Sequence, residues 1–212
     1  MKHQSDILAL KYRPTDFKDL IGQEYLVETI QKSIELNKIP NAYIFTGIRG
    51  VGKTTTARIV AKMLNCTAFD QNNKPDLNNC DQAKAISEDR HPDVIEIDAA
   101  SNTSVENARE IIENVKYNPV LGKYKVYIID EVHMLSKSAF NALLKTLEEP
   151  PPHSKFIFAT TEISKVPITI LSRCQRFDLR RIDKKILFSF LEEIAKKEKI
   201  SISKEAVNLI VR

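Results

Sequence analysis

A short glycine-containing segment is the part of this 212-residue chain best suited to bind phosphate. It matches the pattern Gly-x-x-x-x-Gly-Lys-Ser/Thr at every fixed position. Glycines let backbone amides turn inward around phosphate oxygens, and a following helix adds its free amides and the positive end of its dipole. A glycine-rich turn without a ligand would not need Lys followed by Thr. The pattern predicts a nucleotide-binding loop made of Gly47, Ile48, Arg49, Gly50, Val51, Gly52, Lys53 and Thr54.

Within this loop, two side chains have separate expected tasks. Lys53 is expected to reach the outer phosphates, and the Thr54 hydroxyl is expected to bind Mg²⁺. Two adjacent acids form the second candidate group, because the apolar run 126–129 ends in Asp130 and Glu131. Ligands bind α/β proteins at the carboxyl ends of parallel strands, so Asp130 is expected to hold the magnesium and Glu131 to polarise an attacking water.

The acidic pair has a simpler interpretation, in which it only caps the next turn. Beside an intact phosphate-binding loop, the magnesium–nucleotide site is the favoured interpretation. Kinases and transporters share both features, so the loop and the acids leave the type of reaction open.

Alternating strand and helix patterns could position these groups. Short runs rich in β-branched and aromatic residues predict strands over 42–46, 94–98, 125–130 and 155–160. Apolar residues at helical spacing predict helices over 105–115, after a capping-box pattern at 103–106, and over 139–147, before three prolines. Strands separated by helices imply right-handed crossovers, so residues 1–178 are expected to form a doubly wound α/β domain.

The pattern changes after Phe177. Residues 186–194 and 206–210 carry apolar side chains at helical spacing, and no further strand is predicted. Residues 179–212 are therefore expected to begin a second, all-helical domain. The chain ends on an apolar helix face without a cap, which suggests that this domain is incomplete.

Composition limits the classes of protein that remain. Hydrophobic residues make up 42% and charged residues 28%, as in ordinary folded proteins. No apolar run approaches the roughly 20 residues that span a bilayer, and the amino terminus does not resemble a signal peptide, so a cytoplasmic protein without a membrane partner is expected. Three cysteines argue against a disulfide framework.

The net charge of +4 is unevenly placed. Residues 173–212 hold 11 Lys and Arg against 6 Asp and Glu. This surplus fits either a solvated, lysine-rich helical surface or a face that meets nucleic acid or an acidic partner.

Further motifs make the chain resemble a known family. They are Lys-Tyr-Arg-Pro at 11–14, Ile-Gly-Gln at 21–23, Asp-Glu-Val-His-Met-Leu at 130–135, the run 141–151 and Ser-Arg-Cys at 172–174. With the phosphate-binding loop, these motifs resemble the ATPase module of the bacterial DNA polymerase III gamma/tau family over nearly the whole chain. The resemblance implies a P-loop AAA+ fold, a parallel sheet flanked by helices and followed by a small all-helical lid domain.

The resemblance also implies roles for residues outside the loop. Tyr12, Arg13 and Ile21 would lie near the adenine, Thr161 would read the outer phosphate as a first sensor, and Arg173 would be an arginine finger for a neighbouring subunit. A guanidinium supplied by a neighbour stabilises phosphoryl transfer only after the subunits dock, so assembly would control hydrolysis. Without the resemblance, Thr161 is an ordinary strand-end hydroxyl and Arg173 an edge or exposed basic residue.

One departure from the family concerns zinc. Family members usually carry four zinc-binding cysteines in an insertion, whereas this chain keeps only Cys66 and Cys80 there. Leu77 and Lys74 stand where the middle ligands would be, and closed zinc sites use four N or S ligands. Zinc is therefore not expected. His91 is the one further donor nearby and is expected in a surface turn.

The resemblance implies that this chain is the motor subunit of a replicative clamp loader. Using ATP and Mg²⁺, and together with other clamp-loader subunits, such a motor loads the sliding clamp onto primed DNA. Two alternatives are a nucleotide-insensitive interaction subunit and a P-loop phosphotransferase. The intact loop and acids argue against the first, and the chain shows no second group of residues for an acceptor, which argues against the second.

Several properties stay open at this point. The family's second sensor would lie beyond Arg212, and the sequence does not say whether the protein takes the family's shorter or longer form or which basic residues contact DNA. Taken alone, the 212 residues are expected to be monomeric and to hydrolyse ATP poorly, because Arg173 has no neighbour to serve.

Overall fold

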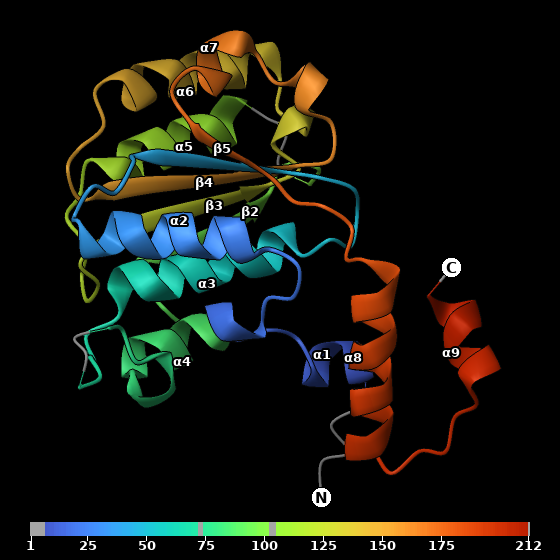
Figure 1. The fold of residues 1–212 in the computed structure, drawn as a ribbon. Helices are drawn as coiled ribbons and strands as arrows, with labels where there is room; N and C mark the ends of the chain where they lie inside the picture. Colours follow the sequence, from blue (N-terminus) through green and yellow to red (C-terminus); the bar gives the residue numbers. More distant parts are fainter. Residues whose placement is uncertain (1–6, 72–73, 102–104, 212) are drawn as a thin grey trace, which may run out of the picture.

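A five-stranded parallel sheet forms the centre of the computed structural model, which describes residues 7–71, 74–101 and 105–211 (Figure 1). The strand order is β2-β3-β4-β1-β5, and every neighbouring pair is parallel. The strands are β1 (Ala42–Thr46), β2 (Val94–Asp98), β3 (Lys125–Asp130), β4 (Ser154–Thr160) and β5 (Gln175–Asp178). All residues of β1 and β4 are buried, as expected for strands covered on both faces.

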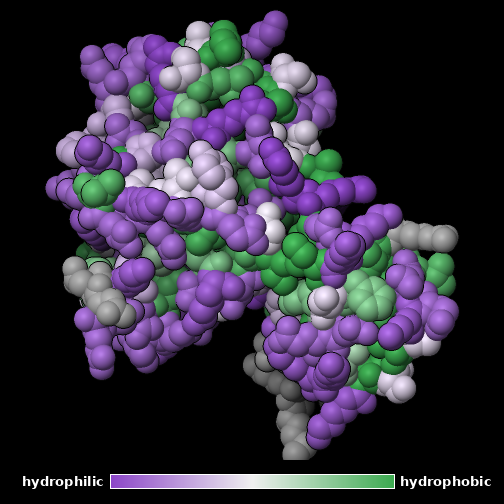
Figure 2. All heavy atoms as spheres, in the orientation of Figure 1, coloured by the Kyte–Doolittle hydropathy of each residue, from purple (hydrophilic) through white to green (hydrophobic). Residues whose placement is uncertain are grey.

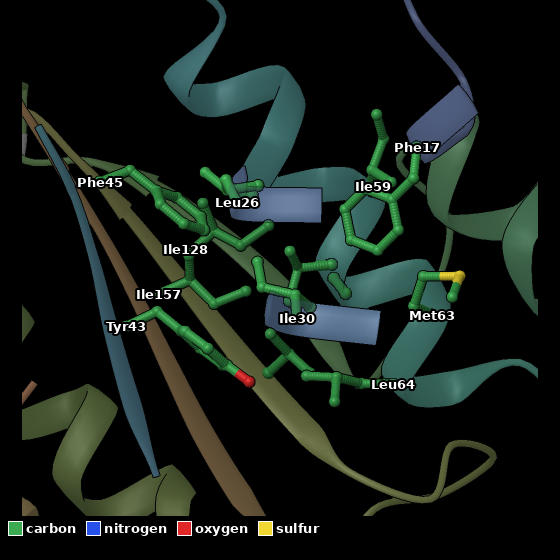
Figure 3. Packing of buried hydrophobic residues seen from close by; sticks show 14 of the residues in the cluster. Phe17, Leu26, Ile30, Tyr43, Phe45, Ile59, Met63, Leu64, Ile128 and Ile157 are labelled. Carbon is green, nitrogen blue, oxygen red and sulfur yellow. The ribbon is translucent and has the colours of Figure 1, made fainter. Parts of the chain in front are cut away.

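Helices cover both faces of this sheet. The described helices are α1 (Leu8–Lys11), α2 (Glu24–Glu35), α3 (Lys53–Asn65), α4 (Asp81–Ser87), α5 (Val105–Val115), α6 (Lys137–Glu148), α7 (Ile168–Leu171), α8 (Lys184–Lys197) and α9 (Lys204–Ile210). Successive side chains of a strand point to opposite faces, which divides the core in two. One half packs α2, α3 and α4 against the sheet, with Tyr43, Phe45, Ile128 and Ile157 from the strands (Figure 3). The other half packs α5, α6 and α7.

The structure confirms the four predicted strands, with β4 starting one residue earlier than expected. It also confirms helices over 105–115, 139–147, 186–194 and 206–210; the expected capping box at 103–106 falls partly outside the described residues. The prediction missed β5, which pairs with β1. This strand lies at the sheet edge and buries only Phe177, so its sequence lacks the apolar run of a central strand.

The carboxyl-terminal helices lie beside the α/β body. Figure 1 shows α8 and α9 at one side, with α1 next to α8. The Tyr12 hydroxyl donates to Glu198 Oε1 at 2.5 Å, and the Gln23 amide donates to the Arg180 carbonyl at 2.9 Å. In Figure 2, hydrophobic side chains gather where these helices meet the body. Among the described residues, no strand follows Asp178.

The predicted surface turn at His91 is wrong. His91 is only 5% exposed, its Nε2 lies 2.5 Å from Gln82 Oε1, and its Nδ1 accepts from the Asp93 amide at 3.1 Å. Next to it, the fully buried Asp93 carboxylate accepts three amides, from Val120, Leu121 and Gly122, each at 2.7 Å. These contacts fix the loop before β3, at the end of the sheet opposite the carboxyl ends of the strands.

Asp93→Asn should lower the free energy of unfolding by about 2 kcal/mol at neutral pH, because amides that now donate to a charge lose that acceptor. Burial raises the pKa of Asp93, but the amides of Gly122, Val120 and Leu121 together outweigh it, so the pKa lies below its usual value. A folded-state pKa below the unfolded value of about 3.9 stabilises the fold above that pH. This contribution is lost as the pH falls through the folded-state pKa.

Urea unfolding of the wild type and Asp93→Asn between pH 7 and pH 3 checks this. The difference between the two proteins should shrink at the acid end. Asp81→Asn is the control, because that side chain is 99% exposed. A loss no larger than that of the control would contradict the role of Asp93.

Candidate nucleotide-binding site

The phosphate-binding loop connects β1 to α3, as its sequence predicts. Gly47 has a φ of +149°, and a Cβ there would lie 2.6 Å from the Leu179 carbonyl oxygen, so no larger residue fits. Gly52 has a φ of +97° and forms the left-handed N-cap of α3. These two glycines bring the loop tightly around the start of a long helix, whose first amides are free to bind an anion.

Lys53 lies beneath this loop and is only 5% exposed. Its Nζ donates to the carbonyl oxygens of Gly47 at 3.0 Å and Ile48 at 3.1 Å. Burial lowers the pKa of Lys53 below its usual value, and the charges of Glu131 and Asp130 offset this only in part. Within the described part of the chain, Lys53 makes no ion pair, so a bound phosphate would supply the negative charge that its buried ammonium lacks. The loop therefore fits a nucleotide phosphate.

Thr54 and Asp130 meet across the site. The Thr54 hydroxyl donates to Asp130 Oδ2 at 2.5 Å, and Asp130 Oδ1 accepts from the Glu131 amide at 2.8 Å. Asp130 ends β3 beside Asp98, its register partner at the end of β2. Hydroxyl and carboxylate oxygens are the ligands that Mg²⁺ prefers, so Thr54 and Asp130 fit a magnesium ion.

Glu131 follows in a left-handed conformation, with a φ of +46°. Its Oε2 accepts two hydrogen bonds from Thr161, from the hydroxyl at 2.9 Å and from the amide at 3.1 Å. Thr161 directly follows β4, and β4 lies between β1 and β3. The sheet order thus places Thr161 between the phosphate-binding loop and the acids.

One cavity of about 870 Å³ joins these groups. It is lined by Arg13, Ile48, Arg49, Gly50, Gly52, Lys53, Thr54, Thr55, Asp98, Ala100, Asp130, Glu131, His133, Met134 and Thr161. Sequence reasoning missed five of these residues, namely Thr55, Asp98, Ala100, His133 and Met134. Two signals were available, because Asp98 ends a predicted strand and His133 belongs to the motif that begins at Asp130.

Of the three residues expected near the adenine, only Arg13 lines the cavity. The Arg13 guanidinium lines the cavity and donates from Nε to Thr55 Oγ1 at 3.0 Å. The Tyr12 hydroxyl instead bonds to Glu198 beyond α8, and Tyr12 and the half-buried Ile21 do not line the cavity. Of the loop, Gly47 and Val51 also stay outside the lining, because they form the back of the turn.

Arg173 is exposed and lies away from this cavity. Its guanidinium forms an ion pair with Glu148, at the end of α6, and donates from Nη1 to the Thr169 carbonyl at 2.6 Å. The chain's own fold therefore does not bring Arg173 to its own site.

The two cysteines of the insertion, Cys66 and Cys80, are both buried. Both are free thiols, and burial raises the pKa of Cys66 to about 12. Burial also raises the pKa of Cys80, but hydrogen bonds from backbone amides and from the Cys66 thiol outweigh it, so the pKa of Cys80 is about 7. Zinc binds the thiolate, and a structural zinc site uses four ligands. The described residues contain no group of three or more His, Cys, Asp and Glu side chains that could hold a metal ion.

No helix in the described ranges combines the length and the apolar character needed to cross a membrane.

Comparisons with known proteins agree with this architecture. A branch migration motor, RuvB of Thermotoga maritima, superposes with a TM-score of 0.66 over 94% of this chain and 59% of its own, at 18% identity. A DNA polymerase III gamma subunit-related protein from the same organism superposes with a TM-score of 0.52 over 86% of this chain and 57% of its own, at 21% identity. These similarities establish the fold, a parallel sheet flanked by helices and followed by further helices.

Two curated relatives are more similar in sequence to this chain than these solved structures are. DNA polymerase III subunit gamma of Buchnera aphidicola (subsp. Schizaphis graminum) is 50% identical over 96% of this chain, and DNA polymerase III subunit tau of Escherichia coli K12 is 48% identical over 97%. The chain spans 56% and 32% of their lengths, respectively.

The model of the family described as "DNA polymerase III, delta subunit" matches residues 22–183. The match covers more than half of the chain, and the relatives above carry the names of gamma and tau subunits. The chain therefore belongs to this family of DNA polymerase III subunits.

Proposed function

We propose that this chain is the ATP-binding and ATP-hydrolysing part of a motor subunit in the bacterial replicative clamp loader. The observation that carries the proposal is the buried Lys53. Among the described residues its hydrogen-bond partners are two carbonyl oxygens, and it lies beneath a glycine loop that faces Asp130 and Glu131. In this proposal residues 1–178 form the nucleotide-binding domain, and residues 179–212 begin the helical lid domain.

Each group at the site has a task in this proposal. The loop amides and Lys53 bind the outer phosphates, and Thr54 and Asp130 hold the magnesium, which when bound neutralises charge on the phosphates. Glu131 accepts the proton of the attacking water. Thr161 holds the Glu131 carboxylate in place, in keeping with the two hydrogen bonds between them, and reads the outer phosphate.

The nucleoside end of the site is proposed at Arg13, with Tyr12 and Ile21 behind it. Tyr12 links this end to Glu198, next to α8. A base bound there would lie where the α/β body meets the carboxyl-terminal helices, so these helices could respond to nucleotide.

Arg173 acts on a neighbouring subunit in this proposal. Its exposure and its distance from the cavity of its own chain support a role in trans. A site completed by a neighbour is active only in the assembled complex, so the isolated chain should be a monomer that hydrolyses ATP slowly.

Arg173→Ala should lower ATP hydrolysis by the assembled complex about 100-fold, because one fixed donor to the developing charge is lost. Nucleotide affinity of the variant subunit should be unchanged, since Arg173 does not line its own cavity. Steady-state hydrolysis and equilibrium binding measure the two effects. Arg176→Ala is the matched control, an exposed arginine three residues away that pairs with Asp178. A variant complex as active as the control would refute the role of Arg173.

The proposed partners are the other clamp-loader subunits, the sliding clamp and primed DNA, and the proposed location is the cytoplasm. The names of the relatives support this assignment. The deciding experiment measures ATP hydrolysis by the full-length protein assembled with its partner subunits. The rate should rise when clamp and primed DNA are added; a rate indifferent to both would contradict the proposal.

A further inference from the structure

A buried histidine lies beside the proposed base. His133 belongs to the short 3-10 turn after Glu131, and its side chain is only 6% exposed. Its Nδ1 lies 3.3 Å from Glu131 Oε2 and 3.0 Å from Thr160 Oγ1, and its Nε2 lies 3.5 Å from Glu162 Oε1. The ring therefore joins the turn that follows β3 to the turn that follows β4.

Each ring nitrogen of His133 faces a carboxylate oxygen, and the nearer one is that of Glu131 at Nδ1. A lone pair on Nδ1 would face a carboxylate oxygen at 3.3 Å, whereas an N–H is attracted to it. The Thr160 hydroxyl oxygen already accepts from the Glu162 amide at 3.0 Å and can accept again through its second lone pair. Nδ1–H thus donates to Thr160 Oγ1 and lies 3.3 Å from Glu131 Oε2, whose negative charge it faces.

The two oxygens of the Glu131 carboxylate have different surroundings. Oε2 receives both hydrogen bonds from Thr161 and faces Nδ1 of His133. Oε1 has no hydrogen-bond partner in the part of the chain that the structure describes. Since Glu131 lines the cavity, one oxygen is anchored to the protein and the other is left for solvent.

We propose that His133 is a positioning residue for Glu131, which it holds through Nδ1–H so that Oε1 is the oxygen presented to the attacking water. The inference rests on the proposed ATPase function. A general base acts efficiently only when its geometry is fixed, and His133 adds to Thr161 a donor from a second element. Loss of this donor should slow hydrolysis far more than it weakens nucleotide binding. His133 lines the cavity, but its polar contacts are with Thr160, Glu131 and Glu162 rather than with Lys53 or Thr54.

The test compares His133→Asn with His133→Gln. The Asn amide nitrogen is bonded to Cγ, as Nδ1 is, whereas the Gln amide nitrogen lies one atom further out, at the depth of Nε2. In the full-length protein assembled with its partner subunits, His133→Asn should keep kcat within about threefold of wild type, and His133→Gln and His133→Phe should lower kcat about 10- to 100-fold. The Kd for a magnesium–ATP analogue should stay within about twofold in all three.

His153→Gln is the matched control. This histidine bonds through Nε2 to the Val115 carbonyl at 3.0 Å and precedes β4, at the end of the sheet opposite the site, so its rate should match wild type. Equal rates for His133→Asn and His133→Gln, whether normal or low, would overturn the proposal. If the kcat values of the His133 variants followed their melting temperatures rather than the position of the amide nitrogen, the proposal would also be overturned. A wild-type complex that does not hydrolyse ATP would refute the proposed function instead.

Discussion

Lys53→Ala is expected to weaken the affinity for magnesium–ATP at least about 10-fold and to lower hydrolysis by the assembled complex about 1,000-fold. The ammonium is buried beneath the loop, and within residues 7–71, 74–101 and 105–211 it bonds only to the Gly47 and Ile48 carbonyls. Its removal takes away the buried cation of the loop, whereas Arg49 stays at the rim as an exposed residue. Calorimetric titration with a non-hydrolysable analogue measures the affinity, and steady-state assays measure the rate.

Lys62→Ala separates this effect from a general loss of packing. Lys62 lies on the same helix, is equally buried, and donates to the Thr15 carbonyl at 3.3 Å rather than to the loop. Both variants should lose some stability, but Lys62→Ala should bind nucleotide as the wild type does. An unchanged affinity in Lys53→Ala would favour a nucleotide-insensitive interaction subunit over a motor.

Glu131→Gln is expected to lower hydrolysis about 1,000-fold while leaving nucleotide affinity nearly unchanged. The amide oxygen of Gln can still accept from Thr161, so the local fold survives, but the side chain no longer takes a proton from water. Single-turnover hydrolysis by the assembled complex, with the affinity measured in parallel, separates chemistry from binding.

The control for this change is Glu28→Gln, an equally conservative substitution of an exposed residue that pairs with Lys32 on α2. It should leave both rate and affinity unchanged. Rapid hydrolysis by Glu131→Gln would mean that another group activates the water, and the assignment of Glu131 would then be wrong.

The parts of the site that could be predicted are those encoded by adjacent residues. The loop requires glycines, Lys53 and Thr54 within eight residues, and Asp130 and Glu131 follow one apolar strand. Such local signals do not depend on the rest of the chain. The central strands β1, β3 and β4 were predictable for the same reason, because burial on both faces demands continuous apolar runs. The edge strand β2 was predictable from its β-branched residues instead.

The features that escaped prediction depend on contacts between distant residues. The hydrogen bond from Tyr12 to Glu198 spans 186 positions, and that from Thr161 to Glu131 spans 30. The edge strand β5 needs only Phe177 to be apolar, so its sequence carries almost no strand signal. His91 was misplaced because a histidine before a proline is typical of a surface turn, whereas here Gln82 and the Asp93 amide satisfy its ring in the interior.

The most direct test of the central claim is a crystal structure of the full-length protein with magnesium and a non-hydrolysable ATP analogue at saturating concentration. We expect density for a triphosphate against residues 47–54, with the metal ion at Thr54 and Asp130. Density that leaves this loop empty, or that places the nucleotide elsewhere on the chain, would contradict it.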